Sequence, residues 1–389
     1  MRVKRTIFSI VLTAVFAIAL VPMTTDYAAG QLSNREITIE LDGNALPVNA
    51  LLHNGEVLLP LRAVAERLGR TVNWDDALRR VCILAGRRTQ VSVTIGRRGA
   101  TVSGNAMRLD APPRLIDSRT FVSLCFFADT MGIGTGFKHD TVILSTRPAA
   151  RIPVLLYHHL LPDALNVTQR NNGAVISVEN FEQQMRYLYD NNFYTPTLDE
   201  LEAFLLRGRP LPRNSVMIHF DDGYYSNFVY AYPILQRYGL RAVLFFITHL
   251  IEDLGDYQPE LCYDGTTFTA AHTIKGTEDV FETASHSHNM HRLVPGSQNT
   301  ILYASTRDAI RRDTLRSFDF VGNHRAYAYP RGQRNETVIA GLQDAGITMA
   351  FTTTQGYVTA RSDPMALERF IIWNTTSIAR FRSIVNIRL

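Results

Sequence analysis

Two patterns of apolar and polar residues take turns along the second half of the chain. Short apolar runs, typical of buried strands, are separated by segments whose apolar residues recur at helical spacing. The runs lie at 152–157, 216–220, 242–247, 326–328 and 349–351, and the helical segments lie at 181–191, 198–206, 231–238 and 337–345. Because parallel strands need a crossover connection, usually a helix, this order predicts parallel βα units and a barrel over about residues 151–389.

An internal repeat marks the first part of the chain, about residues 31–147. The segment 58–69 matches the segment 121–132, and apolar strand-like residues follow both copies. The pattern predicts a short helix in each copy, ended by Gly69 or Gly132, and then a β-hairpin. Alternating residues predict further strands between the copies, at 90–95 and 100–109.

Trp74 and Phe137 occupy equivalent positions in the two copies of the repeat. A tryptophan could stack on a sugar ring if it were exposed. At this spacing after a helix, however, an aromatic side chain is typical of a core position. We therefore expect Trp74 to be buried.

The first 30 residues have a different layout. Arg2, Lys4 and Arg5 precede the apolar run 7–21, and small residues follow at 28–30. This order predicts a secretory signal peptide, with an uncleaved anchor as the alternative. We expect a secreted, extracellular protein that has no membrane span after signal cleavage.

Composition and charge exclude several classes of protein. The 389 residues are 46% hydrophobic and 20% charged, which is ordinary for two or three globular domains. The formal charge of +4 falls to +2 without the signal segment, because that segment carries three basic residues and one acidic residue. Such a small charge does not indicate a nucleic-acid partner. The three cysteines, Cys82, Cys125 and Cys262, lack metal-type spacing and are expected to be small buried side chains.

Candidate chemistry lies where predicted strands end. Asp221 and Asp222 directly follow one strand, and His158 and His159 follow another. A later segment, 286–291, contains three histidines. Ligands bind at the C-terminal ends of parallel strands, so these side chains are expected to converge. The alternative for the two carboxylates is a solvated turn at a strand end.

Two imidazoles and one carboxylate suit a catalytic divalent metal, with a position left open for water. Asp222, His286 and His291 supply this set. A bound metal lowers the pKa of its water from about 15.7 toward 7, so that Asp221 beside it would suffice as the general base. His158 would be the general acid that protonates a leaving amine.

A turn at 329–331 completes the candidate site. Its backbone N–H groups could hold a tetrahedral oxyanion, and one such donor is typically worth about 3 to 4 kcal/mol. Pro330 and Arg331 are therefore candidate oxyanion or substrate residues.

These residues give the second half a strong resemblance to the polysaccharide deacetylase family, the NodB-homology esterases of carbohydrate esterase family 4. The resemblance covers about residues 153–384. HFDDGY, ending at Tyr224, is similar to the family's first motif, which implies that Asp221 is the base and Asp222 a metal ligand. SHSHNMH resembles the histidine motif, which implies ligands at His286 and His291 and leaves His288 as a non-ligand.

Two further segments carry the resemblance. YAYPRG, ending at Gly332, is similar to the oxyanion-turn motif. VLLYHHLLPD resembles a motif of the poly-N-acetylglucosamine deacetylase branch, which implies that His158 rather than His159 is the general acid. AFTTTQGYV and DPMALERF resemble the closing segment of that branch.

Some positions depart from the family's usual pattern. Arg331 stands where a tyrosine is common, Ala328 where many members have an arginine, and His219 where a threonine is frequent. The usual late Leu-x-His is absent, so the acid role rests on His158 alone.

The repeat region resembles the copper amine oxidase N-terminal-like domain of secreted Gram-positive proteins. LLPLRAVAERLG, VNWDD and RLDAPPRLIDSRTFVSL carry this resemblance, which implies a stalk or wall-associated module. No metal-ligand cluster is evident in its sequence, since His53 and His139 are isolated and expected to be solvated.

Together these observations predict an α/β protein with a distorted (β/α) barrel of the NodB type. A small α+β domain of two helix–hairpin repeats precedes the barrel. The expected boundaries are a signal peptide at 1–30, the repeat domain at 31–147, a linker at 148–152 and the deacetylase domain at 153–389.

The expected function is hydrolysis of N-acetyl groups in an N-acetylglucosamine polysaccharide by a secreted, metal-dependent enzyme. Zinc is the expected metal, with cobalt or nickel as alternatives. The N-terminal domain is expected to contact the cell wall. Alternative substrates are peptidoglycan, chitin oligomers or xylan, and an alternative class is a wall-binding protein with a degenerate catalytic domain.

Overall fold

The computed structural model describes residues 35–167, 169–254 and 274–386. The predicted signal peptide and Cys262 lie outside these ranges. Among the described helices, none combines the length and the apolar character that crossing a membrane requires.

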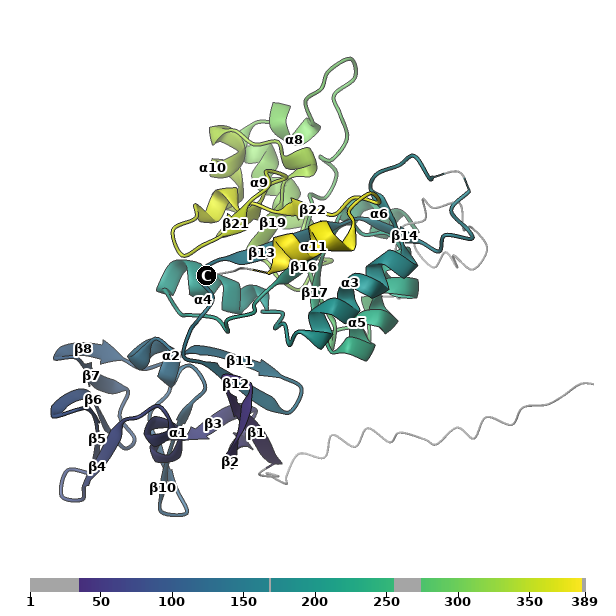
Figure 1. Ribbon diagram of the computed structural model, residues 1–389. Coiled ribbons are helices and arrows are strands. Elements are labelled where there is room, and N and C mark those ends of the chain that lie inside the picture. The colour runs from purple at the N-terminus through teal and green to yellow at the C-terminus, as the bar shows by residue number, and fades with distance from the viewer. Residues whose placement is uncertain (1–34, 168, 255–273, 387–389) are drawn as a thin grey trace, which may run out of the picture. The chain divides into compact units, whose positions relative to one another are not determined.

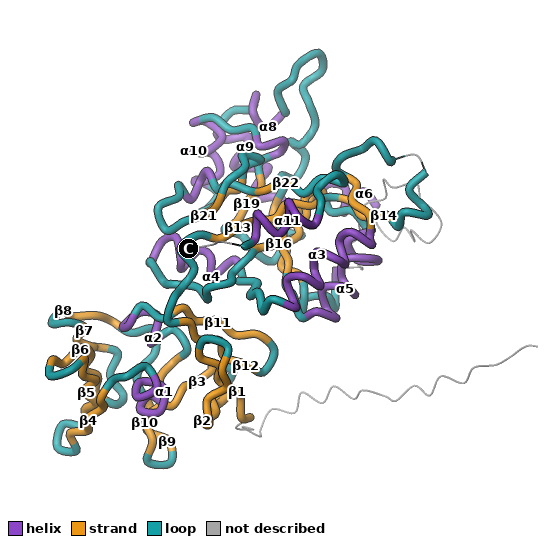
Figure 2. The backbone as a smooth tube through the Cα atoms, viewed as in Figure 1, coloured by secondary structure: helices purple, strands orange, loops and turns teal. Residues whose placement is uncertain are grey.

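Two sheets and two short helices make up the N-terminal part, residues 35–145 (Figures 1 and 2). The seven-stranded sheet has the order β11-β12-β1-β2-β3-β10-β9, and the five-stranded sheet runs from β4 to β8 in chain order. Apart from the parallel pair β1–β12, the neighbouring strands are antiparallel. The elements are β1 Arg35–Leu41, β2 Asn44–His53, β3 Glu56–Pro60, α1 Leu61–Arg67, β4 Thr71–Asp75, β5 Arg80–Ala85, β6 Arg88–Thr94, β7 Gly99–Val102, β8 Asn105–Arg108, β9 Arg114–Ile116, β10 Arg119–Ser123, α2 Phe126–Met131, β11 Gly134–Lys138 and β12 Thr141–Ser145.

Both predicted helix–hairpin repeats are present. The hairpin β4–β5 follows α1, and the hairpin β11–β12 follows α2. Gly69 and Gly132 have φ angles of 73° and 68°, so each takes the left-handed conformation that follows a helix end.

The prediction that Trp74 is a core residue is wrong. Val72, two residues earlier in β4, belongs to the hydrophobic core, whereas the Trp74 side chain is 37% exposed. Its repeat counterpart Phe137 packs against that core. Among the other predictions for this part, His139 is exposed as expected, and His53 and the unbridged Cys82 and Cys125 are half-buried.

A curled sheet organises the C-terminal part, residues 152–385. Its strand order is β20-β19-β18-β17-β16-β13-β21, and β22 also pairs with β13. All of these pairs are parallel except β13–β21. In this part of the chain, β14 and β15 form a separate two-stranded parallel sheet. The strands of both sheets are β13 Ile152–Tyr157, β14 His159–Leu161, β15 Val175–Ser177, β16 Met217–Asp222, β17 Ala242–Phe246, β18 Phe281–Ser285, β19 Ala326–Ala328, β20 Met349–Phe351, β21 Tyr357–Val358 and β22 Phe370–Ile371.

The segment 367–371 draws the two ends of this sheet together. Leu367 forms a parallel bridge with Phe351 of β20, and β22 pairs with Leu155 and Leu156 of β13. The predicted distorted barrel is therefore present, with this short segment between its first and last parallel strands.

The helices cover the outer face of the curled sheet and fill one end of its interior. Alternate strand residues pack outward against α3, α5 and α11 in one large core, as Leu155 and Phe220 do. Their neighbours Val154 and Met217 pack inward in a second core, with α4. The helices are α3 Val178–Asp190, α4 Leu198–Arg207, α5 Tyr232–Tyr238, α6 Thr248–Leu254, α8 Ile301–Ala304, α9 Arg307–Ser317, α10 Glu336–Asp344 and α11 Ile378–Val385.

This alternation places the carboxylates at the end of β16. Because successive strand residues face opposite sides, Asp221 continues the inward series of Met217 and His219. The His219 ring lies against those of Phe245 and Phe351, as an inward direction requires.

Candidate active site

Asp222, His286 and His291 converge at the C-terminal ends of β16 and β18. The Asp222 Oδ1 atom lies 3.5 Å from His286 Nε2 and 3.4 Å from His291 Nε2. One possible ligand atom from each residue lies within 4.8 Å of the others. The set of two imidazoles and one carboxylate fits a catalytic divalent metal.

The local contacts favour the metal-binding form of both histidines. His286 Nδ1 lies 2.7 Å from the carbonyl oxygen of Ala328, which fixes the ring and directs Nε2 toward Asp222. Burial, followed by the charge of His286, lowers the pKa of His291 to about 4. The His291 imidazole is therefore neutral near pH 7, as metal binding requires.

His288 has a different environment, although it belongs to the same motif. Its Nδ1 lies 3.0 Å from Thr248 Oγ1, and its carbonyl oxygen lies 2.8 Å from His249 Nδ1. The backbone N–H groups of His288 and Asn289 donate to the Asp313 carboxylate, each at 2.8 Å. These contacts anchor the loop that carries His291.

The backbone at the site adopts an uncommon conformation at three residues. Asp222, Ser287 and Arg331 have φ angles of 76°, 75° and 55°, in the left-handed region. Such residues cost on the order of 1–3 kcal/mol each and cluster at functional sites. Gly223 follows with φ 84°, and a Cβ atom there would clash with the Phe246 ring.

Asp221 forms a buried, two-pronged ion pair with Arg369. The Arg369 Nη1 and Nη2 atoms donate to the two carboxylate oxygens at 2.8 and 2.7 Å, and Nε donates to the carbonyl of Thr352 at 2.8 Å. Burial acts to raise the pKa of Asp221. Four other influences outweigh burial and hold the pKa of Asp221 well below its usual range. In order of size, they are the charge of Arg369, the charge of His286, the hydrogen bonds from Arg369 and the charge of His158. Asp221 is thus ionised at neutral pH.

Arg369 is the site residue that the sequence analysis missed. It lies in the segment 367–371, which draws the barrel ends together, and it is fully buried. A signal was present, because Ala328 stands where many family members have an arginine. The missing arginine at that position indicates that an arginine from elsewhere in the chain pairs with the carboxylate.

His158 and His159 have distinct surroundings. His159 is buried, with Nδ1 2.6 Å from Ser226 Oγ and its ring against Tyr224. His158 is half-buried, and its charge contributes to the lowered pKa of Asp221. His158 therefore lies close enough to the Asp221 carboxylate for its charge to favour the ionised form.

The turn at Pro330–Gly332 follows β19. The N–H groups of Tyr329, Gly332 and Gln333 donate to carbonyl oxygens, and Pro330 has no N–H group. For the Arg331 N–H, no acceptor is seen among the described residues. Arg331 also lies near the three-residue cluster, since its charge contributes to the lowered pKa of His291.

Two parts of the chain match the models of known protein families. Residues 208–350 match the model of the polysaccharide deacetylase family, and residues 40–144 match that of the copper amine oxidase N-terminal domain. The N-terminal part of the chain thus matches one known family model, and the C-terminal part matches another. Both resemblances drawn from the sequence are confirmed.

Relatives of the C-terminal part include named enzymes. The chain is 26% identical over 208 residues to the poly-beta-1,6-N-acetyl-D-glucosamine N-deacetylase of Staphylococcus epidermidis. The aligned region covers 51% of this chain and 68% of that protein. The chain is 25% identical over 206 residues to the enzyme of the same name from Staphylococcus aureus, 51% of this chain and 67% of that protein.

Solved structures show the same fold. The Streptococcus pyogenes deacetylase PplD superposes with a TM-score of 0.52 at 22% identity, over 62% of this chain and 100% of that one. IcaB from Ammonifex degensii superposes with a TM-score of 0.50 at 22% identity, over 61% and 97%. The curled sheet of the C-terminal part thus has the same fold as these two solved structures.

Proposed function

We propose that this protein is a secreted, metal-dependent hydrolase that removes acetyl groups from the N-acetylglucosamine units of a polysaccharide. The observation that carries the proposal is the convergence of Asp222, His286 and His291 beside the ionised Asp221. The names of the staphylococcal relatives favour a β-1,6-linked polymer as the substrate.

Asp222, His286 and His291 would hold the divalent cation. When bound, such a cation supplies Lewis acidity, which makes a water molecule more acidic and polarises the acetamido carbonyl. Zinc suits this set of ligands best, with cobalt or nickel as alternatives.

Asp221 would act as the general base. Its carboxylate accepts the proton of the attacking water, and the two Arg369 donors fix its orientation. A carboxylate with a lowered pKa is a weak base. This role therefore requires a water molecule that is already acidified.

His158 and Arg331 would act on the other parts of the amide. The water oxygen bonds to the carbonyl carbon, and the Arg331 N–H donates to the oxyanion that forms. His158 then gives a proton to the nitrogen as the carbon–nitrogen bond breaks. Acetate leaves, and the amine stays on the sugar.

Acetate release from β-1,6-linked N-acetylglucosamine oligomers tests the proposal. We expect release to stop with a chelator, to return with zinc, and to fall at least a hundredfold in Asp221→Asn. Full activity of Asp221→Asn would refute the mechanism. Zinc binding without acetate release from any acetylated glycan would instead favour the wall-binding alternative.

Acetate release from a panel of glycans distinguishes the proposed substrate from the alternative substrates. Peptidoglycan, chitin oligomers and acetylated xylan are the comparison substrates, and the first two share the acetamido group with the proposed substrate. Faster release from any of these would move the assignment to that polymer.

The remaining parts of the proposal concern location. We assign residues 1–30 to a signal peptide, 31–147 to a wall-associated domain, 148–152 to a linker and 153–389 to the catalytic domain. The Ala28–Gly30 stretch and the short apolar run before it support export.

A further inference from the structure

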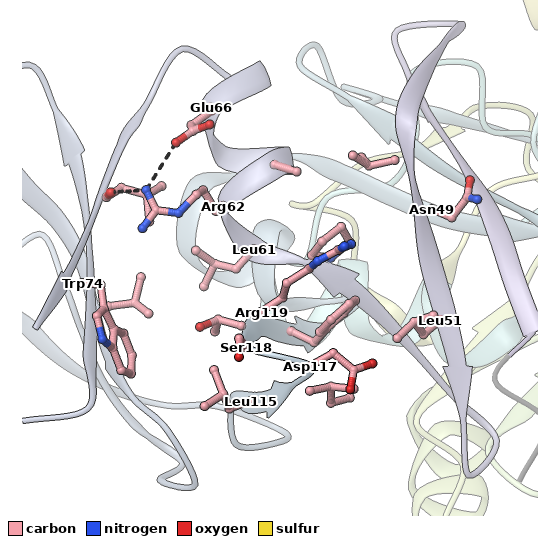
Figure 3. Close-up of a pocket in the computed structure, with 18 of the residues that line it drawn as sticks. Asn49, Leu51, Leu61, Arg62, Glu66, Trp74, Leu115, Asp117, Ser118 and Arg119 are labelled. Atoms are coloured by element: carbon pink, nitrogen blue, oxygen red, sulfur yellow. Dashed lines mark hydrogen bonds and ion pairs between the residues drawn. The ribbon is translucent and has the colours of Figure 1, made fainter. Parts of the chain in front are cut away.

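A pocket of about 940 Å³ lies within the N-terminal part, among α1, β2, β4 and the β9–β10 turn (Figure 3). Its floor is apolar and buried, and its rim is polar. The floor includes Leu61, Val72, Val81 and Phe121, which are at most 6% exposed. Ligand pockets typically have about 300–1,000 Å³ and combine an apolar lining with a few polar groups.

Trp74 lines this pocket, and core packing does not account for its position. Its side chain is 37% exposed, whereas the equivalent Phe137 packs on the core. The indole N–H donates to Asp76 Oδ1 at 3.2 Å, which restricts the ring orientation. Leu115, 43% exposed, lines the same pocket. A large aromatic surface is thus held at the rim.

The polar rim offers donors and acceptors on several sides. In Figure 3, Trp74 and Asn49 lie on opposite sides, with Arg119 between them. Arg62 is held in place by the carbonyl of Val72 at 2.6 Å and by Glu66 at 3.4 Å.

Charge adds to this pattern. Three carboxylates and two guanidinium groups line the pocket, namely Glu36, Glu66, Asp117, Arg62 and Arg119. Asn49 Nδ2 donates to Glu36 Oε2 at 2.8 Å, which orders that side of the rim. The excess of acidic groups favours a ligand that carries some positive charge.

We propose that this pocket binds a segment of an amino-sugar polysaccharide, with one sugar ring stacked on Trp74. A pyranose ring has apolar C–H faces that suit an indole, and its hydroxyl and amide groups suit a rim of carboxylates, guanidinium groups and an amide. The choice of an amino sugar rests on the proposed function, because deacetylation creates ammonium groups that the acidic excess attracts. Binding here raises the local concentration of substrate for the catalytic domain of the same chain.

The tryptophan content of the chain permits a direct test. Trp74 and Trp373 are its two tryptophans. In a full-length Trp373→Phe variant, the indole emission therefore comes from Trp74 alone. The titration uses oligomers of N-acetylglucosamine, oligomers of glucosamine and, as a control, a β-glucan without amino groups, all with a chelator present to stop turnover.

We expect a saturable change in Trp74 emission with the amino-sugar oligomers. In the same background, Asn49→Ala and Arg119→Ala should each weaken binding about tenfold, because both side chains are exposed on the rim and neither supports the core. Leu78→Ala is the matched control, since Leu78 is exposed in the turn that follows β4 and does not line the pocket. It should bind like the parent.

A second readout uses Trp74→Ala in the otherwise native chain. Retention on insoluble amino-sugar polysaccharide should fall about tenfold, while acetate release from short oligomers stays unchanged. The unfolding midpoint of each variant shows whether it is folded.

The outcomes separate this inference from the proposed function. Normal acetate release with no change in Trp74 emission overturns the pocket assignment alone. Equal affinity for the β-glucan overturns the amino-sugar assignment. Trp74-dependent binding without acetate release supports the pocket and refutes the proposed activity instead.

Discussion

Replacing Arg369 by methionine leaves the Asp221 carboxylate buried without its partner. Methionine keeps much of the side-chain length and removes the charge and all three donors. The two Arg369–Asp221 hydrogen bonds measure 2.8 and 2.7 Å, and the two side chains are 0% and 3% exposed. Solvent therefore cannot replace the lost donors without a rearrangement of the site.

The expected loss of stability is large. Removal of one partner from a buried ion pair costs about 3–5 kcal/mol, because the remaining charge stays in a poorly polarisable environment. The pKa of Asp221 should rise at the same time, since burial is the largest single influence on it and acts upward.

The pH dependence follows from the sign of this shift. In the native protein the pKa of Asp221 is depressed below 3.8, so the stability from this pair is present above that value and declines as the pH falls through the depressed pKa. In Arg369→Met the carboxyl group gains its proton at higher pH. We expect the acidic limb of the kcat/KM profile to move upward, and activity at neutral pH to fall at least a hundredfold.

Denaturant unfolding and acetate release measure the two effects. Arg307→Met is the matched control, because Arg307 makes a two-pronged pair with Asp344 of similar geometry, both bonds 2.6 Å, on the surface. It should change stability little. The double variant Asp221→Asn/Arg369→Met should regain part of the lost stability without regaining activity. Equal unfolding midpoints and pH profiles for Arg369→Met and Arg307→Met would refute the reasoning.

Three further predictions concern the frame of the site. Asp313→Ala removes the acceptor of the His288 and Asn289 amides, and calorimetry should show zinc binding about tenfold weaker. Asp308 is exposed on the same helix, so Asp308→Ala should bind zinc like the native chain. Equal zinc affinities of the two variants would contradict this prediction. In urea unfolding, Gly223→Ala should lose about 1–3 kcal/mol more stability than Gly208→Ala. Both glycines have a positive φ, but only at Gly223 would the new Cβ contact a ring, that of Phe246. Equal losses of stability in the two variants would contradict the importance of this contact. Burial raises the pKa of Glu282 from 4.5 to about 7, so the free energy of unfolding should fall by up to about 3 kcal/mol as the pH rises between those values. In Glu282→Gln, whose side chain can still accept from the Leu198 N–H, this decline should be absent. The same pH dependence of unfolding free energy in the native chain and the variant would contradict the assignment of the decline to Glu282.

The order of elements was predictable from the sequence because local patterns determine it. The Ile152–Tyr157 and Ala242–Phe246 strands are apolar throughout, and Thr197 forms a capping box with Glu200 at the start of α4. The convergence of Asp222 with His286 and His291 was expected because the C-terminal ends of parallel strands share one edge, although β18, which ends directly before His286, was not among the predicted strands. By contrast, α9 was not predictable from local patterns, because its few buried residues, Ile310, Thr314 and Ser317, give it a weak apolar pattern.

Two features required the tertiary structure. Arg369 and Asp221 are 148 residues apart, and they meet because the segment 367–371 draws the barrel ends together. No local periodicity encodes such a contact. Trp74 follows the strand pattern of the core, yet its ring lies at a pocket rim, because burial depends on which elements cover the end of β4 rather than on the period of the strand itself.

Adjacent carboxylates at a strand end would ordinarily face opposite sides of the sheet. Asp222 would then follow Phe220 to the outer face, which the helices cover, and it could not reach His286 or His291. The left-handed φ of 76° at Asp222 breaks this alternation, and its Oδ1 lies 3.4–3.5 Å from both imidazoles. Asp221 keeps the strand conformation, stays inward and pairs with Arg369. The left-handed conformation at one residue therefore directs the two neighbouring carboxylates to different partners, as the proposed roles of a metal ligand and a general base require.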